Sequence, residues 1–302
     1  MRNIVLFFII CAAIPSCGEN DKVVYSDNNC KLVPPFVGRL GFNTKNALFS
    51  TSEKKTMGLV LIESADPLNP QAAIIKKYQD SSWKKAGWLA PIQLDEHGNI
   101  FTAPAPFINV LNNPANDQNT IYKVNGQNGH MDAFVKLPAP DSSTDQNPYG
   151  ILGMIYLCET GSLYVSTVAG SNRRVEKGMV YQVNAANGEI SAKLTGMDII
   201  GMGISYINGE RRLFLGRARS SGVYSVALNK KGNFSGKPEL AFSLDGLGTR
   251  GDDKVRRIKT NKDGSLEVHG MEFNFNLIAP TEKQETVYRF VYDEKQKKWV
   301  HQ

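Results

Sequence analysis

The sequence is poor in the residues that most often carry catalysis or hold metal ions. Its 302 residues include only four cysteines and four histidines, and no two histidines have the spacing of zinc ligands. It contains neither the Gly-x-Ser-x-Gly turn of serine hydrolases nor a His-Glu-x-x-His pair. We therefore assign no catalytic residue, no metal ligand and no cofactor, and an enzyme is the less favoured hypothesis.

Long blocks of basic residues are also absent. The net charge is +6, from 35 lysines and arginines against 29 acidic residues, and it is spread along the chain. Proteins that bind nucleic acids usually concentrate such charge in a stripe or carry a known module. The positive charge therefore indicates a solvated surface and no nucleic-acid partner.

Long apolar runs are absent except at the N-terminus. Ile4 to Ile14 is almost wholly apolar and follows the basic residue Arg2. A run of this length is too short to remain as a membrane-spanning helix, whereas it suits the apolar region of a secretory signal. We therefore predict a signal peptide over residues 1–16.

The end of this segment resembles the lipobox of bacterial lipoproteins, through Ile14, Ser16 and Cys17. The resemblance implies cleavage before Cys17, lipidation of its thiol and a membrane partner reached through that lipid. Residues 17–35 would then form the lipidated cysteine and a tether. Gly18 is not the aspartate that retains enterobacterial lipoproteins at the inner membrane, so we favour the outer membrane. The alternative is an ordinary signal peptide with a chance cysteine.

Two cysteines remain for the exported domain, because Cys11 lies in the predicted signal and Cys17 would carry lipid. Cys30 and Cys158 could form one disulfide in an oxidising compartment. Cys158 stands in the apolar stretch MIYLCET, where a buried free thiol is the alternative.

The same short phrase recurs along the rest of the chain. In each phrase, a turn rich in Gly, Asn or Asp leads into a run in which apolar and other residues alternate. One similar run precedes the phrase and two more follow it, which gives four runs in each unit. The residues that open these runs are 52, 63, 50 and 53 positions apart: Leu48, Ile100, Leu163, Leu213 and Leu266. Each unit therefore contains four short strands, among them 37–43 as a first strand and 71–79 as a fourth.

Repeats of four strands in about fifty residues are typical of β-propeller blades. We predict an all-β fold in which residues 36–302 form a single β-propeller of four-stranded blades. Five blades can be counted and a sixth is left open; segment 21–27 is a candidate for closing the ring. A β-sandwich is the alternative, because regular short strands also fit that architecture.

The units resemble the blades of the NHL and SMP-30/gluconolactonase-like propellers over nearly all of residues 36–302. For an SMP-30-like lactonase the resemblance implies a divalent metal at the centre of one face, held by acidic and amide side chains. Asp252 with Asp253, and Asn147 with Tyr149, stand in suitable loops. Solvated loop residues are the favoured interpretation of these fragments, and a metal-dependent hydrolase or lactonase is the alternative function.

A binding site is expected on one face of the propeller. Loops that lead into the innermost strand and loops that leave the second strand share that face, and arginine is frequent in them. Because arginine suits carboxylates, phosphates and interfaces, we predict a binding module for an anionic ligand or an envelope protein. The candidate binding residues are Arg173, Arg174, Arg217, Arg219, Arg250, Asp252, Asp253, Tyr149 and His269. Ordinary surface charge is the alternative.

The register of the repeats also predicts burial. Phe49, Phe101, Tyr164 and Phe214 occupy equivalent positions in the second strands, so they should pack between neighbouring blades. Glu267 holds that position in the fifth unit and should remain accessible to water or a partner, because a buried unpaired carboxylate is costly.

Overall fold

The structure, a computed structural model, describes most of the chain from residue 31 onward. The described ranges are 31–53, 56–69, 72–106, 110–139, 141, 146–277 and 284–302. The predicted signal over 1–16, Cys17, most of the 17–35 tether and segment 21–27 lie outside them. Within the described part, no helix is long and apolar enough to cross a membrane.

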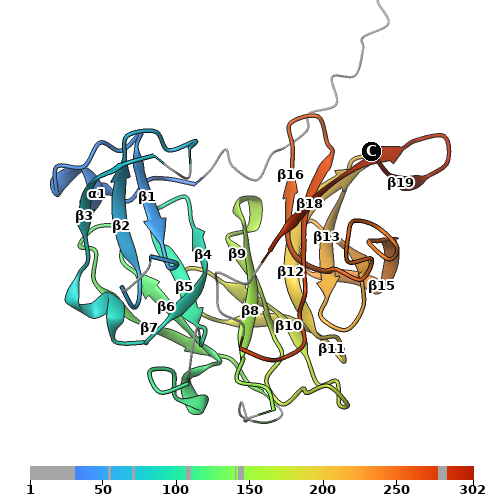
Figure 1. Ribbon diagram of the computed structural model, residues 1–302, viewed down its shortest axis with the longest axis horizontal. Coiled ribbons are helices and arrows are strands. Elements are labelled where there is room, and N and C mark those ends of the chain that lie inside the picture. Colours follow the sequence, from blue (N-terminus) through green and yellow to red (C-terminus); the bar gives the residue numbers. More distant parts are fainter. Residues whose placement is uncertain are drawn as a thin grey trace, which may run out of the picture.

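Five antiparallel sheets follow one another in chain order and form a five-bladed β-propeller, as the repeats predict (Figure 1). The first contains β1 (Ala47–Ser50), β2 (Val60–Ser64) and β3 (Ile74–Tyr78). The second contains β4 (Leu89–Leu94), β5 (Ile100–Pro104), β6 (Thr120–Val124) and β7 (Met131–Lys136), and the third β8 (Ile151–Leu157), β9 (Ser162–Thr167), β10 (Met179–Asn184) and β11 (Ile190–Thr195). The fourth contains β12 (Ile199–Ile207), β13 (Glu210–Arg217), β14 (Gly222–Leu228) and β15 (Phe234–Ser243), and the fifth β16 (Lys254–Thr260), β17 (Leu266–Met271), β18 (Thr286–Asp293) and β19 (Lys298–His301).

Helical structure is scarce in the described residues. It amounts to α1 (Pro35–Arg39) and three short 3₁₀ turns, which are Ser81–Lys84, Ala115–Asp117 and Cys158–Thr160. The strand expected at 71–79 is confirmed by β3.

The strand expected at 37–43 is wrong, because α1 and a turn occupy this segment and the first sheet has three strands in the described part of the chain. Pro35 stands in the first turn of α1, where its fixed φ and missing N–H favour a helix start. The short helix buries Phe36 and Val37, and the Phe36 ring lies 5.8 Å from the ring of Trp83. These residues fill the space between the first two blades, and this tertiary packing decides the local structure.

The repeated phrase is the turn between the first and second strands of a blade. Before β5, the Asp95 carboxylate accepts hydrogen bonds from the backbone N–H groups of His97 (2.9 Å) and Asn99 (2.8 Å). Gly98 between them has φ +76°, and a Cβ on it would lie 2.9 Å from the Cα of Pro34. Glycine is therefore required here both by the backbone conformation and by the neighbouring chain.

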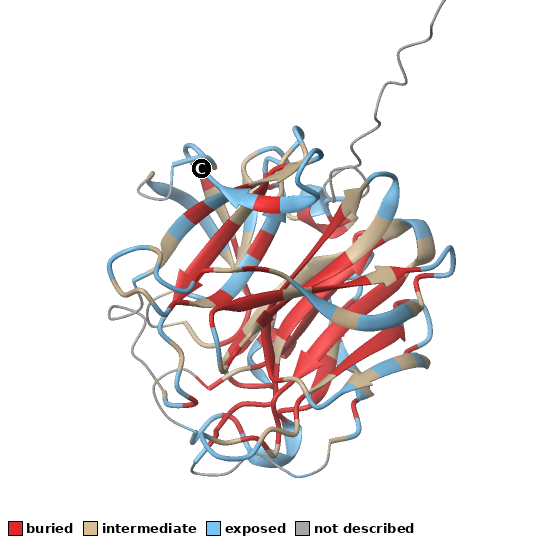
Figure 2. Cartoon of the chain, turned by 90° about the vertical axis from the view of Figure 1, so that its right-hand side faces the viewer, coloured by how far each residue is buried: buried red, intermediate tan, exposed pale blue. Residues whose placement is uncertain are grey.

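Each pair of successive blades encloses an apolar core. Buried residues run along the strands, and the turns and outer edges are exposed (Figure 2). Phe101, Tyr164 and Phe214 are fully buried in these cores, as predicted. Phe49 is half-buried, because β1 is the edge strand of the three-stranded sheet, and its ring packs 6.1 Å from Trp83. Glu267 keeps 32% of its side chain exposed, which confirms the predicted exception.

Cys158 is disulfide-bonded, so the free thiol that its apolar surroundings suggested is wrong. The other three cysteines of the chain lie outside the described residues.

Candidate functional site

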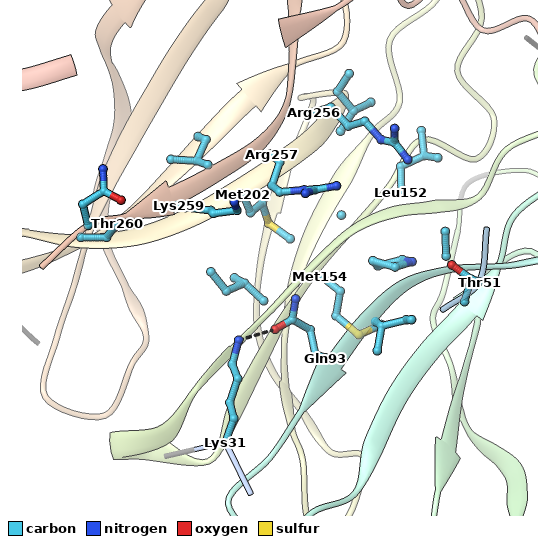
Figure 3. Close-up of a pocket in the computed structure, with 18 residues that line it drawn as sticks. Lys31, Thr51, Gln93, Leu152, Met154, Met202, Arg256, Arg257, Lys259 and Thr260 are labelled. Carbon is cyan, nitrogen blue, oxygen red and sulfur yellow. Dashed lines mark hydrogen bonds between the residues drawn. The ribbon is translucent and has the colours of Figure 1, made fainter. Parts of the chain in front are cut away.

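A cluster of positively charged side chains lies at the centre of the propeller. A pocket of about 540 Å³ is enclosed by the innermost strands β4, β8, β12 and β16. Four cationic side chains line it, and no carboxylate does so among the described residues; the cations are Lys31, Arg256, Arg257 and Lys259. Three of them come from β16, and Lys31 lies across the pocket beside Gln93 (Figure 3). We call this the central pocket.

Irregular pairing at equivalent places in the four inner strands shapes the central pocket. In β16 the register passes from Val255 opposite Gly270 to Arg257 opposite His269, which leaves Arg256 unpaired. Consecutive residues of a regular strand point to opposite faces, whereas a bulge re-aims the extra one. Both arginines therefore line the pocket. The bulge positions of the other inner strands are apolar: Ala90 and Pro91, Leu152, and Ile200.

A second pocket of about 340 Å³ continues from the central one, and we call it the end pocket. The two share six lining residues: Thr51, Ala90, Leu152, Ile200, Arg256 and Arg257. Tyr149 lines the end pocket, is buried, and donates its hydroxyl hydrogen to the carbonyl of Asn276 (2.9 Å). Burial raises the pKa of Tyr149 to about 12, and the charge of Arg256 acts in the opposite direction. The phenol is therefore neutral at physiological pH.

Two of the four cations of the central pocket are held at the ends of one chain of side-chain contacts. Arg256 donates to Glu285 (2.8 Å), which also contacts Nδ1 of His269 (3.2 Å). The other ring nitrogen of His269 lies 2.7 Å from Glu267, and Glu267 accepts from Lys259 (2.7 Å). The hydrogen bond from His269, with Arg256 and Arg257 nearby, lowers the pKa of Glu285 to about 2. The two carboxylates thus balance Arg256 and Lys259.

Arg257 differs from these neighbours. Its guanidinium forms no hydrogen bond or ion pair within the described ranges, although its charge reaches Glu285 and helps to lower that pKa. The side chain is exposed to the central pocket. Lys31 donates to Oε1 of Gln93 (3.3 Å), and this contact places its ammonium group at the central pocket. Arg257 is consequently the group best placed to meet an anion.

Two of the arginines predicted from the sequence are engaged with acidic residues that the prediction did not include. Arg217 donates to both oxygens of Glu176 (2.7 and 2.9 Å), and Arg219 donates to Asp198 (2.6 Å). Asp198 is fully buried. Its burial raises the pKa of the carboxyl, while the hydrogen bonds from Ser171 and Arg219 act in the opposite direction. Glu176 and Asp198 reduce the positive potential expected from the arginines.

Arg250 is engaged in the same way, because it donates to Asp253, which is fully buried and also accepts from the Tyr288 hydroxyl (2.8 Å). Burial alone would raise the pKa of Asp253, but these hydrogen bonds hold it below its usual range. The pair fixes the loop that precedes β16.

Three predicted residues meet in a separate pocket of about 330 Å³, namely Arg173, Arg219 and Asp252. Arg174 lies next to Arg173 and is exposed. Tyr149 and His269 belong instead to the surroundings of the central and end pockets. The predicted set is therefore divided among several environments, and its role in binding stays a prediction.

The donor groups available do not fit the divalent metal that an SMP-30-like lactonase would hold. Asp252 is exposed beside Lys254 (3.5 Å), and Asp253 is occupied by Arg250. The amide of Asn147 is buried and bonded to the backbone of Val168 and Tyr149. The part of the chain that the structure describes contains no group of three or more His, Cys, Asp or Glu side chains arranged to bind a metal.

Sequence comparison identifies no relative, since no family model and no curated protein matches this chain. Several solved structures are similar in fold. A glucose dehydrogenase has 13% identity and a TM-score of 0.42, with 85% of this chain and 79% of that chain covered. An exo-β-1,3-galactanase from Phanerochaete chrysosporium has 9% identity and a TM-score of 0.49, with 84% and 60% covered. An α-L-arabinofuranosidase from Lactobacillus brevis has 11% identity and a TM-score of 0.44, with 83% and 91% covered. Likeness at this level bears on neither activity nor ligand.

Proposed function

We propose that the protein is a binding module of the cell envelope that takes an anionic ligand into its central pocket. The observation that carries the proposal is the set of four cations lining that pocket, with no carboxylate among its described lining residues. Arg257 supplies a guanidinium that forms no hydrogen bond with the residues that the structure describes.

The physical basis is the geometry and hydration of the guanidinium group. Arginine presents a rigid fork of donors that matches carboxylate and phosphate oxygens, and it is more weakly hydrated than lysine. A concave site lined by charges of one sign also concentrates counter-ions. Because Arg256 and Arg257 stand side by side at the bulge of β16, one anion can interact with both.

The residues that line the central and end pockets also provide a test of the alternative function, a hydrolase. Most glycoside hydrolases use a pair of carboxylates, and a metal-dependent lactonase needs oxygen ligands for its cation. The described residues that line the central and end pockets supply hydroxyl and amide oxygens but no carboxylate. This observation favours binding over hydrolysis in this pocket.

We further propose that lipid at Cys17 anchors the module to the outer membrane. The apolar run after Arg2 and the lipobox-like Ser16-Cys17 support export and lipidation. The disulfide of Cys158 supports the same location, because such bonds persist in oxidising compartments. An envelope protein is the second candidate partner, and the exposed Arg173 and Arg174 support a contact on their face.

The test is calorimetric titration of the purified protein with acetate, sulfate and inorganic phosphate. Arg257→Gln should weaken binding of the preferred anion at least about tenfold, the size expected for a charge-assisted hydrogen bond. Lys230→Gln, which removes an exposed charge from an outer turn, should leave the affinity unchanged. Absence of binding for all three anions, or equal affinities of the two variants, would contradict the proposal.

A further inference from the structure

We infer that the ligand is an amphiphilic anion, with a carboxylate or phosphate group joined to an apolar body. The anionic group meets Arg257 in the central pocket, and the apolar body lies in the end pocket. This inference rests on the proposed function and specifies the chemical class of its ligand.

The first support is the continuity of the two pockets. They share the bulge positions Leu152, Ile200 and Arg256, together with Arg257. One molecule can therefore contact the guanidinium groups and extend past them between Leu152 and Ile200. Their volumes of about 540 and 340 Å³ are both suited to a small organic molecule.

The second support is the apolar character of the end pocket. Tyr149, Ile200 and Phe275 form a buried cluster that lies apart from the cores between blades, and Leu152 and Phe273 pack against it. The Tyr149 and Phe273 rings are 5.8 Å apart. Leu152 and Phe273 are only half-buried, so they retain surface that an apolar ligand can cover.

The third support is that the described residues lining the end pocket hold no negative charge that would repel an anion. The Tyr149 hydroxyl already donates to the Asn276 carbonyl, and no carboxylate lines this pocket among the described residues. The neutral phenol of Tyr149 also does not repel an anion.

The experiment compares three probes by isothermal titration calorimetry: acetate, 4-phenylbutyrate and 4-phenylbutan-1-ol. We expect 4-phenylbutyrate to bind at least about tenfold more tightly than acetate, because it also buries an apolar ring. It should also bind at least about tenfold more tightly than the uncharged alcohol, because only the acid meets Arg257 through a charge-assisted bond.

Variants separate the two parts of the site. Phe273→Asn, at a residue that lines the end pocket and not the central pocket, should weaken 4-phenylbutyrate binding about tenfold and leave acetate binding unchanged. Leu240→Asn, at an exposed position of the outer strand β15, is the matched control and should change neither. Arg257→Gln should weaken both acids. If Phe273→Asn does not fold, Phe273→Ser tests the same wall.

The outcomes distinguish this inference from the function on which it rests. If acetate and 4-phenylbutyrate bind with equal affinity and both depend on Arg257, the amphiphilic class is wrong and the anion site stands. If no anion binds, both are wrong. Equal binding of the acid and the alcohol would show an apolar pocket without a role for charge, and would also overturn the inference.

Discussion

Arg256 and Arg257 are consecutive residues of β16, and both line the central pocket. The bulge that leaves Arg256 without a partner on β17 makes this arrangement possible. Arg256 is bonded to Glu285 and Arg257 is not bonded to any described carboxylate, so two adjacent arginines have different roles. Arg256 is held in place, and Arg257 is available to a ligand.

The contact between Arg219 and Asp198 should be structural. Arg219→Ala leaves the fully buried Asp198 without its guanidinium, and we expect a loss of about 3–5 kcal/mol in the free energy of unfolding. Arg173→Ala, at an exposed position in the same region, should change it by less than about 0.5 kcal/mol. Urea denaturation measures both, and similar effects of the two variants would contradict the assignment.

Tyr164 tests the packing between blades. Tyr164→Ala removes a fully buried ring and should cost about 3–5 kcal/mol of unfolding free energy. Tyr164→Phe removes only the hydrogen bond from the hydroxyl to the Gly232 carbonyl (2.6 Å) and should cost about 1 kcal/mol. Phe49→Ala, at the half-buried equivalent, should cost less than Tyr164→Ala. The reverse order would refute the register of the repeats.

Glu285 should make stability depend on pH in the acid range. Its pKa in the folded protein is about 2, below the ordinary value of 4.5, so its ionised form is stabilised by folding. This contribution is fully present above the ordinary pKa and is lost as the pH falls through the folded one. We expect wild type to exceed Glu285→Gln by roughly 2 kcal/mol near neutral pH, with the difference disappearing toward about pH 2. A difference that does not change with pH would contradict the role of the charge.

Cys158 should contribute to stability through its disulfide. Because Cys11 lies in the predicted signal and Cys17 is the proposed lipid site, we predict that the partner is Cys30. Peptide mapping without reduction should recover a linked pair of peptides carrying Cys30 and Cys158. Cys158→Ser should lower the free energy of unfolding by about 2–4 kcal/mol. A pairing of Cys158 with Cys17 would exclude lipidation at that thiol.

Cys17→Ser tests the anchor. It should abolish labelling by radioactive fatty acid and release the protein or leave an uncleaved precursor. Cys11→Ser, inside the predicted signal, is the control and should keep both labelling and membrane retention. Normal labelling of Cys17→Ser would disprove lipidation at this residue.

The sequence predicted the propeller because each blade repeats a local pattern of turns and alternating apolar residues. Gly98 and Gly264 allow the positions of two hairpin turns to be predicted from the sequence. Both glycines have positive φ in the structure. The segment 37–43 was mispredicted, because α1 forms where its residues pack against Trp83, a contact distant in sequence. Local pattern cannot reveal such packing.

The pocket charge was harder to foresee. Nothing in the sequence around Asp198 shows that it reaches Arg219, so the sequence alone does not reveal that this arginine is paired. Arg256 and Arg257 were missed, because strict alternation would direct only one of two adjacent strand residues to the centre. Two adjacent arginines in an innermost strand are the sequence feature that indicates a bulge at this position.

The most direct test of the central claim is the position of a bound anion. Selenate resembles sulfate in charge and shape, and anomalous X-ray diffraction from crystals of the protein soaked in it locates the selenium atom. We predict an anomalous peak in the central pocket within hydrogen-bonding distance of the Arg257 guanidinium, absent from crystals of Arg257→Gln. Peaks confined to exposed residues such as Arg173 and Arg174, with none at Arg257, would contradict the account.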